Sequence, residues 1–445
     1  MKKIVWKLLE AVAVLVLLFG LCSALQHWTD QGRSAAIARF RKPESIVWHE
    51  IGIRAKARQE KSDIHSPRPD VPAGASDTVA ADKKLGDLFK GRKSERSKPD
   101  PYVWIPLRDW LPQMQVAFEK SVQEYQNRIP GIRAAADLFD DLPAISLSDD
   151  LHNLRELEDF GRWALTLCFA ARDEAREGDR GKGLQDLVLA LKLADTMARR
   201  PHPESYEAHA TIYQDVSTIY QETYARGDVS CEQASELLAH LAKAYHRDAL
   251  ADSLCCSVYS ALELGSDMRE RPLSEVGGFV DKVAFLSARS PFLEPYLSIN
   301  EVAFVETATR LAELVGHPPY DSKRSVDQIK AEIERGSVLH KIAEWVALDQ
   351  FKIMNWQAPH EATVDLMRIG ISLEVYYAEN GAYPATLESI AGYLGGSVPL
   401  DAFTGVPYRY EPHGDSFDLR SAGMAPRYDL KQRSSTPAVL AWRGE

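Results

Sequence analysis

Apolar residues recur at spacings of three and four between residues 154 and 244, and this period constrains the fold more than any other feature of the chain. Such stripes are typical of helices that bury one face. They are interrupted at Gly178-Asp179 and at Pro201-His202-Pro203, where glycine and proline favour helix ends. The pattern predicts consecutive antiparallel helices, with further helices around residues 301–316 and 339–356.

The third stripe carries Tyr206, Tyr213 and Tyr220, which we expect to line a helix interface. The same segment contains residues whose types suit a metal site, namely His202, Glu204, Glu207 and His209. On a helix Glu207 and His209 point about 200° apart, so we expect a solvated surface there. The pairs His49-Glu50 and His360-Glu361 lack the second histidine that a zincin helix requires.

A membrane anchor is expected at residues 1–27. An apolar run at residues 11–25 follows Lys2, Lys3 and Lys7, the pattern of a signal anchor or a cleaved signal. We expect an uncleaved, single-pass anchor in the inner (cytoplasmic) membrane, with the bulk of the chain on the periplasmic or extracytoplasmic side; cleavage stays open. Residues 28–100 are rich in Lys, Arg, Ser and Pro, which predicts a flexible charged linker.

The chain has 445 residues, which favours two or three structural units. Its net charge of −11 is unlike that of nucleic-acid-binding proteins, so nucleic acid is not an expected partner. We expect a helical domain at 101–357 and a C-terminal domain at 358–445. The cysteines Cys168, Cys231, Cys255 and Cys256 fall in helical patterns and are expected in the core, with their disulfide state open.

After Pro359 the pattern of apolar residues changes, and it predicts one helix followed by strands. Ala362, Leu366 and Ile369 form a helix stripe that Gly381 ends. We expect strands within residues 383–390 and 398–403, and a β-hairpin whose arms are residues 408–410 and 417–419.

This C-terminal order resembles the globular domain of the major pseudopilin of type II secretion. The residues that match its motifs are Tyr377, Gly381, Tyr383, Pro384, Asp401, Gly405, Pro407, Tyr408, Tyr410, Phe417, Ser421 and Gly423. The resemblance implies a small α+β domain with an antiparallel sheet, in which these residues have structural roles. In the family an Asp after Ser-x-Gly helps to hold calcium; Ala425 stands there, although Asp429 is near, so no cofactor is expected.

The whole layout is similar to bacterial envelope proteins of unassigned function, which join an N-terminal anchor to a helical middle. We therefore expect a mainly α chain: a membrane helix, an irregular, weakly tetratricopeptide-like helical array, and a pseudopilin-like α+β domain. Filament subunits carry a Gly before the first helix, where Val5 stands here.

No nucleophile elbow, phosphate-binding loop or dinucleotide fingerprint occurs in the sequence. We expect a non-enzymatic envelope protein that binds protein partners as a scaffold, within a secretion or surface assembly. Two alternatives remain: an envelope hydrolase whose site assembles from residues distant in sequence, and a pseudopilin subunit. The sequence does not give the partner or the oligomeric state.

Overall fold

The computed structural model describes residue 31 and residues 129–134, 150–199, 203–224, 231–270, 294–335, 341–423, 425–429, 434–438 and 441–444. The expected anchor at 1–27 lies outside these residues, and so does the expected linker at 28–100 apart from Gln31. Within the described part of the chain, no helix is both long enough and apolar enough to cross a bilayer.

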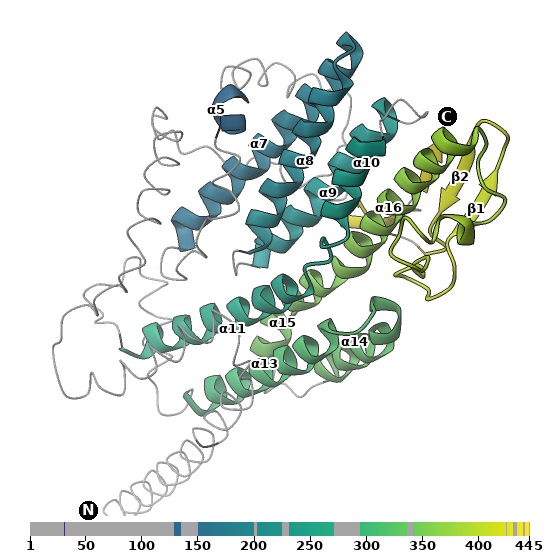
Figure 1. Ribbon diagram of the computed structural model, residues 1–445. Coiled ribbons are helices and arrows are strands. Elements are labelled where there is room, and N and C mark those ends of the chain that lie inside the picture. Colours follow the sequence, from purple (N-terminus) through teal and green to yellow (C-terminus); the bar gives the residue numbers. More distant parts are fainter. Residues whose placement is uncertain are drawn as a thin grey trace, which may run out of the picture. The chain divides into compact units, whose positions relative to one another are not determined.

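The described chain is mainly helical, as the apolar period predicts (Figure 1). Its α-helices are α5 (Ile129–Ala134), α7 (Asp150–Glu177), α8 (Arg180–Ala198), α9 (Pro203–Thr223), α10 (Cys231–Leu241), α11 (Arg247–Glu270), α13 (Glu294–Val315), α14 (Pro319–Glu334), α15 (Lys341–Asn355) and α16 (Gln357–Asn380), and a 3-10 helix, η4, spans Leu387–Ile390.

The predicted helix ends are confirmed where the sequence supplies a local stop. Gly178 between α7 and α8 has φ 96°, a left-handed conformation that favours glycine. Asp179 caps α8, since its side chain accepts a hydrogen bond from Lys182 N at 3.2 Å. Gly381 ends α16 with φ 71°, and its N–H donates to Tyr377 O at 2.8 Å.

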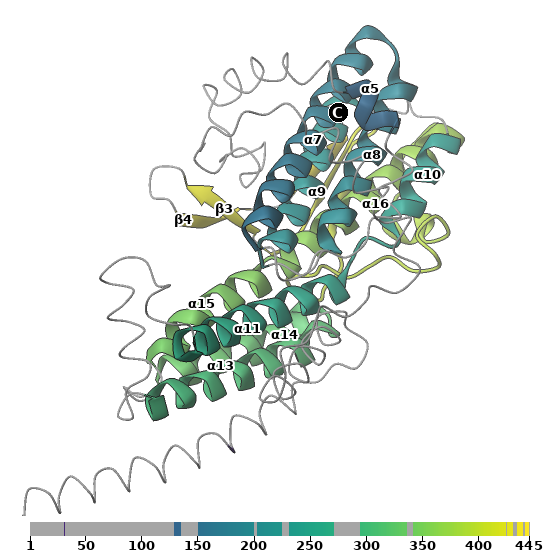
Figure 2. The same cartoon turned by 90° about the vertical axis from the view of Figure 1, so that its left-hand side faces the viewer.

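The described helices fall into two compact units. The first holds the described parts of Leu254–Gly316 and Arg324–Lys352, and the second those of Asp63–Ser253, His317–Lys323 and Ile353–Glu445. In the first unit α11, α13 and α15 lie side by side (Figures 1 and 2). The side chains buried there include Cys255, Cys256, Val258, Phe304, Leu311, Ile329 and Phe351. Gln350 of α15 donates to Ser257 Oγ of α11 at 3.3 Å, which joins these two helices.

In the second unit α7, α8 and α9 pack side by side, and α10 and α16 pack against this layer (Figures 1 and 2). Tyr206, Tyr213 and Tyr220 are fully buried, as expected for residues of a helix interface. One continuous apolar core joins α8, α9 and α10 to α16 and β2. It therefore contains residues of both expected ranges, 101–357 and 358–445. Cys168 lies in this core as a buried free thiol.

The strands are short and antiparallel: β1 (Arg409–Pro412), β2 (Phe417–Arg420), β3 (Ala425–Asp429), β4 (Ser434–Ala438) and β5 (Ala441–Gly444). One sheet has the order β1-β2-β5, and β3 pairs with β4 in a separate hairpin. The predicted β1–β2 hairpin is confirmed, with Tyr410 opposite Leu419. Phe417 and Leu419 of β2 are buried, so one face of this sheet covers the core.

Several elements differ from the sequence predictions. Residues 383–390 do not form a strand: Leu387–Ile390 is the 3-10 helix η4, with Leu387 and Ile390 buried. Within residues 398–403 only Leu400 makes an isolated bridge, to Pro407. Helix α14 was not predicted because its charged residues dilute the apolar stripe, and β5 was not predicted because its pairing with β2 is distant in sequence.

Substitution of Gly183 tests the close approach of α7 and α8. A Cβ at Gly183 would lie 2.7 Å from Ala171 O and would also clash with Tyr224 Oη, which donates to that same carbonyl at 3.0 Å. We expect Gly183→Ala to lower the free energy of unfolding by about 1–3 kcal/mol through overpacking, measured by urea unfolding. Gly392→Ala is the control, because no atom lies within 4 Å of its added Cβ. Equal stabilities of the two variants would contradict the packing described.

Candidate functional site

The residues that resemble the pseudopilin motif lie together around the C-terminal end of α16 and the loops before the sheet. The Tyr377 and Tyr383 rings have centroids 4.6 Å apart, and Tyr383 Oη donates to Glu374 Oε1 at 3.1 Å. Pro384 O accepts a hydrogen bond from Tyr410 Oη at 2.8 Å. These contacts hold the segment after Gly381 against the helix and the sheet.

The second half of the motif is built around the carboxylate of Asp401, which is fully buried. This carboxylate accepts hydrogen bonds from Ser421 Oγ at 2.9 Å and from the backbone N–H groups of Phe403, Ala422 and Gly423 at 2.9, 2.6 and 3.2 Å. Asp401 therefore joins the turn that contains Gly405 to the end of β2. Since protein donors satisfy the carboxylate, its role in this arrangement is structural.

Gly405, Pro407 and Tyr408 complete the motif. Gly405 has φ 69° in the turn that Asp401 begins, and Pro407 bridges to Leu400. Tyr408 is buried and its Oη donates to Asp365 Oδ2 at 3.0 Å. Calcium binding was considered at Ala425 and Asp429, and the side chains of these residues lie outside the described part of β3.

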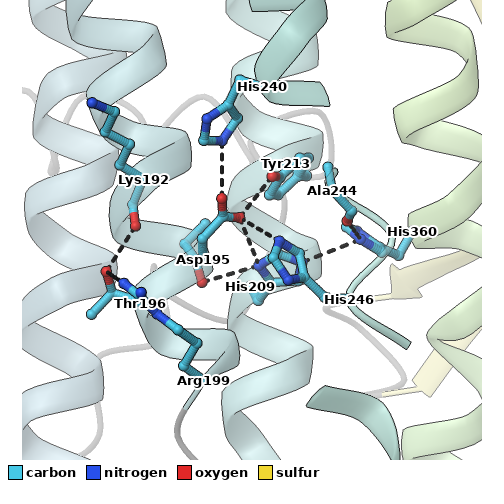
Figure 3. Close-up of polar contacts among 11 residues, drawn as sticks. Lys192, Asp195, Thr196, Arg199, His209, Tyr213, His240, Ala244, His246 and His360 are labelled. Atoms are coloured by element: carbon cyan, nitrogen blue, oxygen red, sulfur yellow. Dashed lines mark hydrogen bonds and ion pairs between the residues drawn. The ribbon is translucent and has the colours of Figure 1, made fainter. Parts of the chain in front are cut away.

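A separate group of titratable side chains, one aspartate and four histidines, lies in the second unit. Figure 3 shows that Asp195 of α8 lies among four histidines from other elements. Its Oδ1 accepts a hydrogen bond from Tyr213 Oη at 2.8 Å and lies 2.9 Å from His246 Nε2. Its Oδ2 lies 3.0 Å from His240 Nε2, within ion-pair distance. We call Asp195, His209, His240, His246 and His360 the histidine cluster.

The histidine cluster continues from Asp195 to α16 through His209 of α9. His209 Nδ1 lies 3.0 Å from Ala194 O and 3.9 Å from Asp195 Oδ1, and its Nε2 lies 3.2 Å from His360 Nε2. His360 Nε2 lies 2.8 Å from Ala244 O, in the turn after α10. Both His209 and His360 are fully buried. The cluster thus links α8, α9, the α10–α11 connection and α16.

His246 reaches this position through an unusual backbone conformation. Its φ is 43°, and among the described residues it is the one non-glycine residue with a positive φ. Such a conformation costs free energy for a residue with a Cβ and is found where a side chain must be aimed in a particular direction. Here it directs the imidazole of His246 at Asp195 immediately before α11 begins.

Electrostatics fix the protonation states of the two groups in the middle of the cluster. Burial raises the pKa of Asp195, but the contacts with His240 and His246 outweigh it and hold that pKa well below its usual range. Burial, together with the neighbouring histidines, lowers the pKa of His209 far below its usual value. Asp195 is therefore an anion at neutral pH and His209 a neutral imidazole.

A second polar group lies on α16, beside the cluster. Arg247 forms a bidentate ion pair with Glu361, with Nε–Oε1 and Nη2–Oε2 distances of 2.9 and 2.8 Å. One turn further along α16, Asp365 accepts hydrogen bonds from Tyr245 Oη at 2.5 Å and from Tyr408 Oη at 3.0 Å. Asp365 thereby joins the α10–α11 connection to the loop before β1.

The expectation of a solvated surface at His209 was wrong, because that residue is fully buried. Glu204 is exposed and Glu207 half-buried, so those two do face outward, and His202 lies outside the described residues. Glu207 and His209 do point in different directions, as the helical geometry predicts, but His209 is the one that faces the core. His209 follows the buried Tyr206 by three residues, and this spacing places both on one helix face.

Comparison with protein-family models, curated proteins and solved structures finds no match to this chain.

The pH dependence of stability tests the burial of Asp365. Burial raises the pKa of Asp365 to about 7, despite hydrogen bonds from Tyr245 and Tyr408 and the charge of Arg368, all of which lower it. Between about pH 4 and pH 7 the unfolded carboxyl ionises while the folded one stays protonated, so this group makes the protein less stable as the pH rises. The free energy of unfolding of Asp365→Asn should therefore rise relative to that of the wild type as the pH increases from 4 to 7, by up to roughly 4 kcal/mol in total.

The measurement is urea unfolding of both proteins at several pH values from 4 to 8, followed by circular dichroism. Asp415→Asn, in the exposed turn between β1 and β2, is the control. Its difference from the wild type should stay constant across this range. A constant difference for Asp365→Asn as well would contradict the raised pKa.

Proposed function

We propose that this chain is a non-enzymatic, membrane-anchored envelope protein that binds protein partners as a scaffold, as a component of a secretion or surface assembly. The apolar run near its start supplies the membrane anchor in this proposal, and the bulk of the chain lies on the extracytoplasmic side. The helical array and the pseudopilin-like part supply the binding surfaces.

The observation that carries the proposal is that the buried histidines and carboxylates are paired with other protein groups inside the fold. His209 and His360 have no exposed surface, and the carboxylates of Glu361, Asp365 and Asp401 are also buried. Arg247, tyrosines and backbone N–H groups satisfy these carboxylates. Groups held in this way stabilise contacts between helices and do not meet a substrate. This favours a scaffold over the hydrolase alternative.

The order of elements in the C-terminal part supports the pseudopilin-like component of the proposal. A long helix, α16, ends at Gly381 and is followed by η4 and by the antiparallel β1-β2-β5 sheet. The motif residues Asp401, Ser421 and Gly423 contact one another directly. Pseudopilins act through contacts with other proteins, and a binding role for this chain follows only by that analogy.

The proposal predicts a membrane-bound protein with reproducible partners. The full chain should sediment with membranes, resist extraction at alkaline pH and dissolve only in detergent. Chemical crosslinking in intact cells, followed by affinity purification and mass spectrometry, should return the same partner proteins in repeated experiments.

The matched control replaces residues 1–27 with a cleavable secretion signal. This variant should reach the same compartment and keep its partners but lose its retention in the membrane. Recovery of the full chain from the cytosol without detergent would contradict the anchor. Failure to capture any reproducible partner with either protein would contradict the scaffold function.

A further inference from the structure

Four consecutive residues that lead into α11 each contact an ionisable side chain of α8 or α16. The contacts are Ala244 O to His360 Nε2 at 2.8 Å, Tyr245 Oη to Asp365 Oδ1 at 2.5 Å, His246 Nε2 to Asp195 Oδ1 at 2.9 Å, and Arg247 Nη2 to Glu361 Oε2 at 2.8 Å. We call residues 244–247 the junction. Most of its partners belong to α16, so the charge states of side chains on that helix decide how firmly the junction is held.

The contact between His209 and His360 fixes where the hydrogens of both rings lie (Figure 3). His209 Nδ1 faces Ala194 O at 3.0 Å, and His360 Nε2 faces Ala244 O at 2.8 Å. Because a carbonyl oxygen only accepts hydrogen bonds, each of these nitrogens must carry a hydrogen. His209 Nε2, which lies 3.2 Å from His360 Nε2, is then an acceptor, and the two neutral rings fit together.

Neither ring has a place for a second proton. On His209 that proton would lie on Nε2 and point at the N–H of His360, so that two donors would face each other. On His360 it would lie on Nδ1, which is buried and has no hydrogen-bond partner among the described residues. The arrangement of α9, α16 and the junction therefore accepts only the neutral forms of both histidines.

The pKa values of the two histidines follow from the same surroundings. Burial lowers the pKa of His360 to about 4, although the contact with Ala244 O raises it. Burial, followed by the charges of His360 and His246, lowers the pKa of His209 well below its usual value. In a released segment both imidazoles would have the ordinary pKa of about 6.5. Below that pH an open form binds two more protons at these sites than the closed form, so acid favours opening.

We propose that the junction and α16 form a proton-operated latch, which is closed at neutral pH and opens when His209 and His360 take up protons. Opening separates residues 244–247 from α16 and breaks the contact between His209 and His360. The latch is a conformational device within the second unit. It goes beyond the scaffold function, since a scaffold requires no response to pH.

Other ionisable groups surround the histidine pair and the junction. They are Asp195 of α8, Tyr206 and Tyr213 of α9, His240 of α10, Tyr245 and His246 between α10 and α11, Arg247 of α11 and Glu361 of α16. Burial raises the pKa of Tyr206 and Tyr213, and the contacts with histidines hold the pKa of Asp195 well below its usual range, so these three keep their charges between pH 5 and pH 7. His240, His246 and Glu361 are the same in every variant used below, so differences between variants do not include them.

Asp365 opposes the two histidines. Burial raises its pKa to about 7, although Tyr245, Tyr408 and Arg368 lower it. Between about pH 4 and pH 7 the closed form holds a proton on Asp365 that the open form releases. The open form of the wild type thus gains two protons on histidines and loses one on Asp365. Opening should therefore increase about 10-fold for each unit by which the pH falls from 6.

The test is hydrogen exchange of the full chain in detergent at pH 5, 6 and 7, resolved by peptide mass spectrometry. Exchange rates divided by the intrinsic rates at each pH give the opening constant of amides in the junction and in the first turns of α16. From pH 6 to pH 5 this constant should rise about 10-fold in the wild type and about 100-fold in Asp365→Asn. In His360→Gln it should stay nearly constant, because glutamine can still donate to Ala244 O but takes up no proton.

His209→Asn is the second histidine variant, since an asparagine amide can still donate to Ala194 O, and it should also lose the rise. His413→Gln, in the turn between β1 and β2, is the control and should behave as the wild type. An opening constant that does not rise in the wild type from pH 6 to pH 5 would overturn the proposal. So would a variant of His209 or His360 that keeps the wild-type rise.

Discussion

The carboxylate of Asp195 is the group on which the arrangement of the second unit depends. A charge taken out of water costs several kcal/mol unless other groups compensate it, and removal of one partner of such a charge typically costs about 3–5 kcal/mol. Here the compensating groups are Tyr213, His240 and His246, which come from three different segments. These segments can satisfy Asp195 only in one relative position, so the carboxylate selects how α8, α9 and the α10–α11 connection meet.

The same requirement extends to the C-terminal part through α16. His209 and His360 contact each other across the α9–α16 interface. Glu361 accepts hydrogen bonds from Arg247 at the start of α11, and Asp365 accepts one from Tyr245 in the α10–α11 connection. Apolar packing alone specifies such an interface loosely, whereas buried polar pairs exclude alternative registers because each misalignment leaves a polar group without a partner. A scaffold benefits from this, since its binding surfaces keep a fixed separation.

The sequence predicted those features that depend on neighbouring residues. The stops at Gly178-Asp179 and Gly381 are local conformational requirements, and the β1–β2 hairpin follows from alternation around a turn. The pairing of β2 with β5 and the contact of His209 with His360 join residues far apart in sequence, and no local pattern encodes them. For His209 a signal was present in its spacing from Tyr206 and Tyr213, both of which were expected in a helix interface.

The central claim is that the helices around Asp195 and the C-terminal α16 form one cooperative structure. Hydrogen exchange of the full chain, resolved by peptide mass spectrometry, tests it most directly. In the wild type the slowest amides of α8, α9 and α16 should open with the same free energy, and in Asp195→Asn all of them should lose protection together. Retention of full protection by α16 in this variant, while α8 and α9 exchange faster, would contradict the account.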